Sequence, residues 1–351
     1  MSSSFAIGVD LGGTNLRAAA IDTDGNLLEK ITLGTQVSKG REFVIKEICA
    51  SIKALTDRYA GKLTLCGVGM GMPGIIDKRT SMLRESPNLP GWHDYPVRDD
   101  ISQRLGTEVI LENDANAAAF GENWLGAAKG YDEMCMITLG TGVGGGLVLR
   151  GGVWLGMNGM AGEVGHVTVD PNGQPCGCGN VGCVEQYSSA TAIMRMAREE
   201  IASGNAPELA KLATGPNIEF SARAVFNLAL QGDPVAQRIY DKVGWALGIL
   251  IGDMVNILNL RMCVLGGGVS NGWPAFAPAM FRELRKRSMV YAATAPPDEF
   301  IAVGAAAKVT PQQPPPYRTI VTRALLGSDA GLYGAARLPM VKKFDRRQKI
   351  F

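Results

Sequence analysis

Short apolar runs alternate with longer amphipathic stretches along the chain. Apolar runs bounded by glycine, proline or asparagine are typical of strands, and the expected strands are 5–10, 16–21, 27–33, 63–70, 75–77, 108–112, 133–139, 147–150 and 262–265. Apolar positions at helical spacing predict helices at 41–59, 97–105, 115–124, 186–203, 208–211, 222–231, 234–259, 278–287 and 332–338. Gly244, Gly248 and Gly252 recur every four residues, which predicts close packing of their helix on a sheet.

Three glycine-rich turns follow expected strands, at 10–15, 140–146 and 266–270. Gly12 and Gly13 allow backbone N–H groups to converge on an anion, and the carboxylate of Asp10 can order a hydrated Mg2+. An ordinary glycine hairpin explains this first turn equally well. The third turn is placed to pass under an adenine or a ribose.

The first two turns are not the common nucleotide motifs. Neither contains the GK[ST] of a Walker A loop, and neither is a GxGxxG that opens a helix after one strand. A phosphate-binding hairpin that occurs twice is the simpler interpretation. The residues of the three turns that we expect to contact nucleotide are Asp10, Gly12, Gly13, Thr14, Asn15, Arg17, Thr141, Gly142, Gly144, Gly267 and Gly268.

One loop gathers three cysteines and a histidine within eighteen positions: His166, Cys176, Cys178 and Cys183. This set matches a closed tetrahedral zinc site of the Cys3His type. Scattered buried thiols have no reason to gather in a polar loop, and a disulfide framework would leave one cysteine unpaired. The loop is rich in glycine, so little besides the metal is expected to order it. A closed zinc site is structural, and we therefore expect the chemistry in the nearby carboxylates of Glu163 and Glu185.

Asn113 and Asp114 stand where an expected strand ends and an alanine-rich helix begins. A carboxylate at that position can act as a general base, although capping of the helix is the commoner role of aspartate there. Two prolines and a glycine exclude a helix at 86–92, so Asn88 lies on an irregular loop of the kind that carries binding groups.

Composition limits the class of protein. The chain has 351 residues, 46% of them hydrophobic and 19% charged, which suggests a soluble enzyme of two domains. A net charge of +2 gives no general attraction to nucleic acid or membrane. The N-terminus has no signal-peptide pattern, and the apolar stretch 245–260 is interrupted by Asp253, Asn256 and Asn259. Free cysteines without a secretory signal predict a cytoplasmic protein.

The motifs at 10–15, 139–146, 163–166 and 176–185 resemble those of the ROK (repressor, open reading frame, kinase) family of sugar kinases. The resemblance runs from about residue 7 to 336. It implies an α/β fold of the actin-like and hexokinase-like ATPase type, with two lobes and a central cleft that holds ATP and Mg2+. It also implies that Asp114 is the general base, that sugar is bound by Asn113, Glu163, His166 and Glu185, and that structural zinc is bound by His166, Cys176, Cys178 and Cys183. We expect Gly74 and Asn88 to bind the sugar as well.

On this basis we expect a small lobe at 1–117, joined by the C-terminal helix at about 330–340, and a large lobe at 118–329 that contains the zinc loop 166–183. A proline-rich surface insertion at 295–316 and a basic tail at 341–351 are additions to the family pattern. Repressors of the family carry an N-terminal winged helix, for which a nucleotide strand starting by Phe5 leaves no room. We expect a homodimer or homotetramer.

The reaction that the resemblance favours is the ATP-dependent phosphorylation of glucose to glucose 6-phosphate. Alternatives within the family are kinases of N-acetylmannosamine, N-acetylglucosamine, fructose or allose, and a polyphosphate donor. A sugar-sensing protein without catalysis is an alternative of another class, and the presence of Asp114 argues against it. A nucleic-acid module conflicts with the near-neutral charge. The expected partners are therefore a small sugar and a nucleotide.

Overall fold

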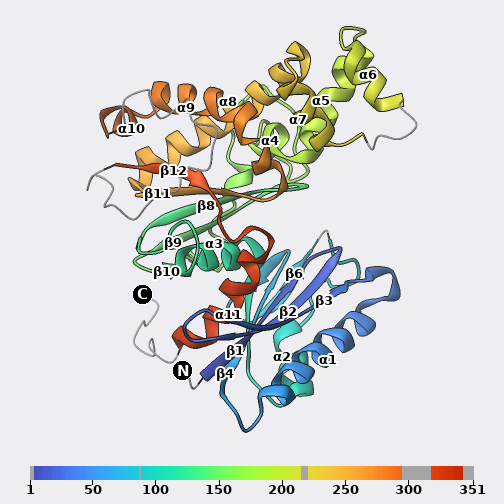
Figure 1. Ribbon diagram of the computed structural model, residues 1–351, viewed down its shortest axis with the longest axis vertical. Coiled ribbons are helices and arrows are strands. Elements are labelled where there is room, and N and C mark those ends of the chain that lie inside the picture. Colours follow the sequence, from blue (N-terminus) through green and yellow to red (C-terminus); the bar gives the residue numbers. More distant parts are fainter. Residues whose placement is uncertain (1–3, 87, 215–219, 295–317, 343–351) are drawn as a thin grey trace. The chain divides into compact units, whose positions relative to one another are not determined.

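The computed structural model describes residues 4–86, 88–214, 220–294 and 318–342 (Figure 1). The described chain divides into two compact units, one within Met1–Met136, Gly146–Gly162 and Leu325–Phe351, the other within Ile137–Gly145 and Glu163–Ala324. Residues 118–136, which the sequence analysis assigns to the large lobe, belong to the first unit. The proline-rich insertion at 295–316 and nearly all of the basic tail lie outside the described residues.

The sheet of the first unit has the order β3-β2-β1-β4-β7. The two β1–β2 and β2–β3 pairs are antiparallel, whereas β1–β4 and β4–β7 are parallel. Its strands are β1 (Ser4–Leu11), β2 (Asn15–Asp22), β3 (Leu27–Gly34), β4 (Thr64–Met72) and β7 (Val109–Asn113). A separate hairpin consists of β5 (Ile75–Asp77) and β6 (Met82–Glu85). The parallel arrangement brings the carboxyl ends of β1, β4 and β7 to one edge of this sheet.

Apolar side chains along β1 point alternately to the two faces of the sheet. Phe5, Ile7 and Val9 pack in the core with α1 (Arg41–Tyr59) and α2 (Val97–Leu105), while Ala6 packs with α11 (Ala330–Lys342). A Cβ at Gly8 would clash with the backbone of α11, so glycine permits the close approach of this helix. Helix α3 (Asp114–Trp124) packs against α11 as well.

The second sheet has the order β10-β9-β8-β11-β12. Its strands are β8 (Met134–Leu139), β9 (Val143–Leu149), β10 (Gly152–Val153), β11 (Met262–Gly266) and β12 (Ile320–Arg323). The turn predicted at 140–146 is too long, because β9 already begins at Val143. Gly146 lies inside that strand, where a Cβ would come within 2.7 Å of the Cβ of Ala119 in α3. Gly146 therefore allows α3 to pack closely on β9 and is not part of a turn.

The second unit is rich in helices. They are α4 (Glu185–Ser188), α5 (Ala190–Ala202), α6 (Pro207–Thr214), α7 (Ala222–Leu230), α8 (Pro234–Leu258), α9 (Trp273–Arg287) and α10 (Met289–Thr294). The single helix predicted at 186–203 is wrong, because Ser189 is extended and its side chain caps α5 by accepting from the Ala192 N–H. Among the described residues, no helix has the length and apolar character needed to cross a membrane.

The glycine stripe of α8 faces another helix. A Cβ at Gly244 would clash with the carbonyl of Phe276 in α9, and one at Gly248 would come within 2.6 Å of the carbonyl of Met280. The expectation that the stripe packs on a sheet is therefore wrong, and the two helix backbones approach each other instead. The pattern of small residues predicts close contact but not the type of the partner.

Candidate functional site

The carboxyl edge of β1, β4 and β7 gathers several predicted site residues. In the sheet register Asp10 lies opposite Gly71, and Gly71 lies opposite Glu112. Asn113 ends β7 and Asp114 starts α3, so both follow directly at the same edge. A Cβ at Gly71 would lie 3.7 Å from the Cα of Asp114, and the negative charge of Asp114 contributes to raising the pKa of Asp10.

Asp10 is a largely buried carboxyl group. Burial raises its pKa from 3.8 to about 6, the Arg17 guanidinium opposes this, and the charges of Asp114 and Asp329 add to it. Arg17 Nη1 lies 3.3 Å from Asp10 Oδ2 and donates to the carbonyl of Ser328 at 2.8 Å. Arg17, predicted to contact nucleotide, is thus engaged within the protein through Asp10 and Ser328.

The start of α3 separates two roles that the sequence left open. Asn113 is the N-cap, and its Oδ1 accepts from the N–H groups of Ala115 at 2.9 Å and Asn116 at 3.3 Å. Its Nδ2 donates to the carbonyl of Gly74 at 3.3 Å. Asp114 is the first helical residue, where the helix dipole favours a carboxylate. The interpretation of Asp114 as the cap is therefore wrong, since its neighbour has that role.

The first glycine turn connects β1 and β2. The Gly12 N–H donates to the carbonyl of Asn15 at 2.8 Å, so this group is used inside the turn. Thr14 and Asn15 are exposed. A Cβ at Gly13 would touch Asn88 at 3.4 Å, which places the predicted binding loop directly against the turn.

The second glycine turn is held by the helices that follow the cysteine loop. Glu185 Oε2 accepts from the Val143 N–H at 2.9 Å, and the Thr191 hydroxyl donates to the Thr141 carbonyl at 2.8 Å. A Cβ at Gly142 would clash with the Glu185 carboxylate. Gly142 thus permits close contact between a predicted sugar ligand and a predicted nucleotide turn, whereas Gly144 lies within β9.

The third glycine turn lies against the second. Gly267 has a φ of 82°, and a Cβ there would clash with the carbonyl of Leu139, the last residue of β8. Gly268 opens a short 3-10 helix, where its carbonyl accepts from Asn271 Nδ2 at 3.1 Å. Arg323 Nη2 donates to Asn271 Oδ1 at 2.6 Å. The sequence reading missed Arg323, because it did not predict the strand β12.

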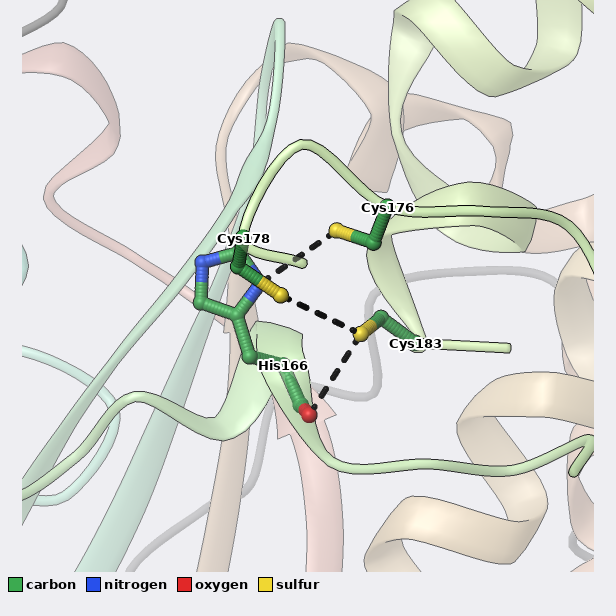
Figure 2. Close-up of side chains that lie close together, drawn as sticks. All are labelled: His166, Cys176, Cys178 and Cys183. Carbon is green, nitrogen blue, oxygen red and sulfur yellow. Dashed lines mark hydrogen bonds between the residues drawn. The ribbon is translucent and has the colours of Figure 1, made fainter. Parts of the chain in front are cut away.

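The predicted metal ligands converge, as Figure 2 shows. One ligand atom from each of His166, Cys176, Cys178 and Cys183 lies within 4.8 Å of all the others. His166 Nδ1 lies 3.6 Å from Cys176 Sγ, and the sulfurs of Cys178 and Cys183 lie 3.7 Å apart. Three sulfurs and one imidazole nitrogen at such separations fit a tetrahedral Zn2+. Because Nδ1 faces the sulfurs, the other ring nitrogen points away from them (Figure 2).

The cysteine loop is also held by contacts that do not need a metal. Tyr187 donates from its hydroxyl to Asp170 Oδ2 at 3.0 Å, and Asn180 Nδ2 donates to the Thr168 hydroxyl at 2.8 Å. Antiparallel bridges join Thr168 to Cys183 and Pro175 to Val181. The expectation that little besides the metal orders this loop is therefore wrong.

Glu163 and His166 approach the same strand end as Glu185. Glu163 precedes the 3-10 helix Val164–His166 and accepts from the His166 N–H through its carbonyl at 3.1 Å. A Cβ at Gly165 would clash with the carbonyl of Val143. The backbone of Val143 thus touches both the 163–166 segment and the Glu185 carboxylate, so these predicted sugar ligands come from segments that meet at the start of β9.

Two buried carboxylates were not singled out from the sequence. Glu122 in α3 is fully buried and accepts from the N–H groups of Ala127, Leu325 and Leu326 at 2.7, 3.1 and 2.7 Å. Glu112 in β7 is 4% exposed and pairs with Lys78 at 2.6 Å. An acidic residue within an otherwise apolar strand or helix was the available signal in both cases.

Comparison with known proteins agrees with this arrangement. The chain is 40% identical to the glucokinase of Thermotoga maritima over 81% of this chain and 87% of that protein. The ROK hexokinase of Thermus thermophilus has a TM-score of 0.76 at 32% identity, covering 97% of this chain and 99% of that one. A ROK glucokinase of Streptomyces griseus, solved with glucose and AMPPNP, has a TM-score of 0.71 at 32% identity, covering 95% and 99%.

These similarities confirm the predicted α/β fold of the hexokinase-like type. The model of the ROK family matches residues 6–341, which is nearly the whole chain. The motifs at the glycine turns and the cysteine loop lie inside this match. The protein belongs to the ROK family.

Proposed function

We propose that this protein transfers the γ-phosphoryl group of ATP to the 6-hydroxyl of glucose. The relative from Thermotoga maritima is a glucokinase, and the similar structure from Streptomyces griseus was solved with glucose and an ATP analogue. Both similarities extend over most of this chain. The choice of glucose among hexoses rests on these relatives.

Asp114 is the general base in this proposal, and one observation carries the assignment. Asn113 caps α3, so the neighbouring Asp114 is not needed as the cap and stands at the carboxyl edge beside Asp10. A sugar hydroxyl becomes a competent nucleophile when a positioned carboxylate accepts its proton, a contribution of ~100- to 10,000-fold. The proton of the 6-hydroxyl passes to an Asp114 carboxylate oxygen as the bond from the 6-oxygen to the γ-phosphorus forms and the bond from that phosphorus to the bridging oxygen breaks, which releases ADP.

Asp10 is the residue proposed to hold Mg2+. Its carboxyl is buried close to a second carboxyl group, and a hydrated divalent cation at that point would favour the charged form of both. When bound, Mg2+ neutralises charge on the phosphates during transfer. Backbone N–H groups of the turns that contain Gly13, Thr141 and Gly267 are proposed to receive the nucleotide.

Several of the proposed sugar ligands have hydrogen-bond donors or acceptors left for the sugar. Glu185 Oε2 is bonded to the Val143 N–H, which leaves Oε1 to accept from a hydroxyl. Asn113 uses Oδ1 to cap α3 and one Nδ2 hydrogen to bond the Gly74 carbonyl, which leaves one amide hydrogen. His166 would bind zinc through Nδ1 and donate to sugar through Nε2. Glu163, Asn88 and Gly74 complete the proposed set.

A coupled assay of ADP release with a panel of sugars tests the function. Glucose with ATP should give the highest kcat/KM, and a tenfold higher value for fructose or an N-acetylhexosamine would overturn the choice of sugar. Product formation with polyphosphate in place of ATP would show that polyphosphate also serves as the phosphoryl donor. Sugar binding without any turnover would instead support a sugar-sensing protein. Sedimentation of the same sample tests the proposed homodimer or homotetramer.

A further inference from the structure

We propose that the buried ion pair between Lys78 and Glu112 is a positioning device for Asp114. The inference rests on the proposed role of Asp114 as general base. Neither residue is assigned a contact with sugar or nucleotide. Their effect on the reaction would act through the junction between β7 and α3, where Asp114 stands.

Glu112 organises that junction through three contacts. Its Oε1 accepts from the Asn113 N–H at 3.0 Å and from Asn116 Nδ2 at 3.1 Å, and its Oε2 meets Lys78 Nζ at 2.6 Å. Asn113 and Asn116 flank Asp114 and its neighbour in the first turn of α3. One carboxylate therefore fixes residues on both sides of the proposed base.

Lys78 joins the junction to the β5–β6 hairpin. Its Nζ also donates to the carbonyl of Leu111 at 2.8 Å, while the carbonyl of Gly74 at the start of the hairpin accepts from the Asn113 amide. The hairpin thus contacts the β7–α3 junction through Lys78 and through the Gly74 carbonyl. Gly159 lies directly over the Lys78 side chain, where any Cβ would clash with it. Only about a fifth of that side chain is exposed.

Because this network is buried, the loss of one of its partners should disturb the others. The Glu112 side chain is 5% exposed, and a buried carboxylate that loses its cation must move, protonate or admit water. Asn116 is 2% exposed, and its Oδ1 has no hydrogen-bond partner among the described residues. Its amide is therefore oriented by the single bond to Glu112. A shift of Glu112 would release both Asn116 and the Asn113 N–H together.

The distinguishing property is a loss of rate without a matching loss of binding. A displacement of about 1 Å at a reacting group can lower the rate ~100-fold. Lys78→Met should lower kcat ~10- to 100-fold and raise KM for glucose by a smaller factor, through Asn113 and Gly74. Lys78→Arg keeps the charge and should recover most of the rate. A purely structural role would lower the melting temperature without lowering kcat per folded molecule.

Two further variants serve as controls. Glu112→Gln keeps the acceptor for Asn113 and Asn116 but removes the charge, so it should lower kcat less than Lys78→Met; it also replaces that variant if Lys78→Met does not fold. Arg84→Met breaks the pairs of Arg84 with Asp77 and Asp94 in and beside the same hairpin. Its kcat should stay within ~2-fold of the wild-type value, because those pairs do not reach the β7–α3 junction.

A double-mutant cycle completes the test, with kcat measured for Lys78→Met, Asp114→Asn and both together at saturating glucose and ATP. If the pair acts through Asp114, Lys78→Met should cost less than ~3-fold in the Asp114→Asn background. Two losses that multiply in full would overturn the positioning role while leaving the base assignment intact. A near wild-type rate for Asp114→Asn alone would instead reject the base assignment. Unchanged kcat in Lys78→Met, or in Glu112→Gln where Lys78→Met does not fold, would also overturn the inference.

Discussion

Glu185 accepts a hydrogen bond from the backbone N–H of Val143 at 2.9 Å. The bond connects a carboxylate proposed to bind sugar with the turn proposed to bind nucleotide. Gly142 allows the contact, because any side chain there would displace the carboxylate. The carboxylate proposed to bind sugar and the turn proposed to bind nucleotide are therefore joined directly by this hydrogen bond.

Glu185→Ala should weaken the binding of both substrates. Loss of a charge-assisted hydrogen bond of ~1.5–3 kcal/mol should raise KM for glucose ~10- to 100-fold and also raise KM for ATP. Glu185→Gln can still accept from Val143, so KM for ATP should change less than ~3-fold. Thr191→Val, which removes only the bond to the Thr141 carbonyl, should affect ATP and spare glucose. An ATP KM that is unchanged in Glu185→Ala would contradict the connection.

Asp10 should make stability depend on pH. Its pKa is raised to about 6 from 3.8, chiefly by burial, so the protonated form stabilises the fold below pH ~4, and this contribution is lost as pH rises through about 6. The difference corresponds to about 3 kcal/mol. Asp10→Asn should therefore melt higher than wild type at pH 8, with the difference vanishing below pH ~4. A difference in melting temperature that is the same at pH 4 and pH 8 would refute this account.

Zinc should be present at one ion per chain and should act indirectly. Cys178→Ala should lose the zinc, lower the melting temperature by ~5 °C or more and raise KM for glucose more than KM for ATP. The chain should stay folded, because Tyr187 and Asp170 still hold the loop. Cys49→Ala, outside the cluster, should change neither zinc content nor KM. A zinc-free protein with unchanged glucose affinity would rule out the coupling.

The contact of α8 with α9 should be sensitive to one methyl group. Gly244→Ala introduces a Cβ that clashes with the backbone of α9, and should lower the free energy of unfolding by ~1–3 kcal/mol. Gly252 is the matched control, because a Cβ there has its nearest neighbour at 3.5 Å. Gly252→Ala should be neutral or stabilising by up to ~1 kcal/mol. Urea denaturation of both variants measures the difference, and equal midpoints would argue against close helix packing.

The parts that were predictable from the sequence depend on local chemistry. The helix Arg41–Tyr59 was predicted at its observed bounds, because its apolar period and its flanking glycine are local signals. The cluster of His166, Cys176, Cys178 and Cys183 was predicted because cysteines and a histidine in a polar loop have few other uses, and zinc binding there stays a prediction. The family follows from the same short motifs.

The parts that were missed depend on tertiary contacts. Gly144 and Gly146 look like turn residues, but β9 extends through them because Gly146 packs on α3. The capping role went to Asn113 instead of Asp114, which only the geometry of the helix start decides. Lys78 is distant in sequence from Glu112, so nothing local connects them. Such features are missed because the same residue type can interact either with a sequence neighbour or with a residue distant in the chain.

The rate of glucose 6-phosphate formation by Asp114→Asn, compared with wild type at saturating glucose and ATP, tests the central claim most directly. Loss of the base should lower kcat ~100-fold or more, while the affinity for glucose and the melting temperature stay close to those of wild type. A variant that forms glucose 6-phosphate at near the wild-type rate would contradict the claim, and the base would then lie elsewhere.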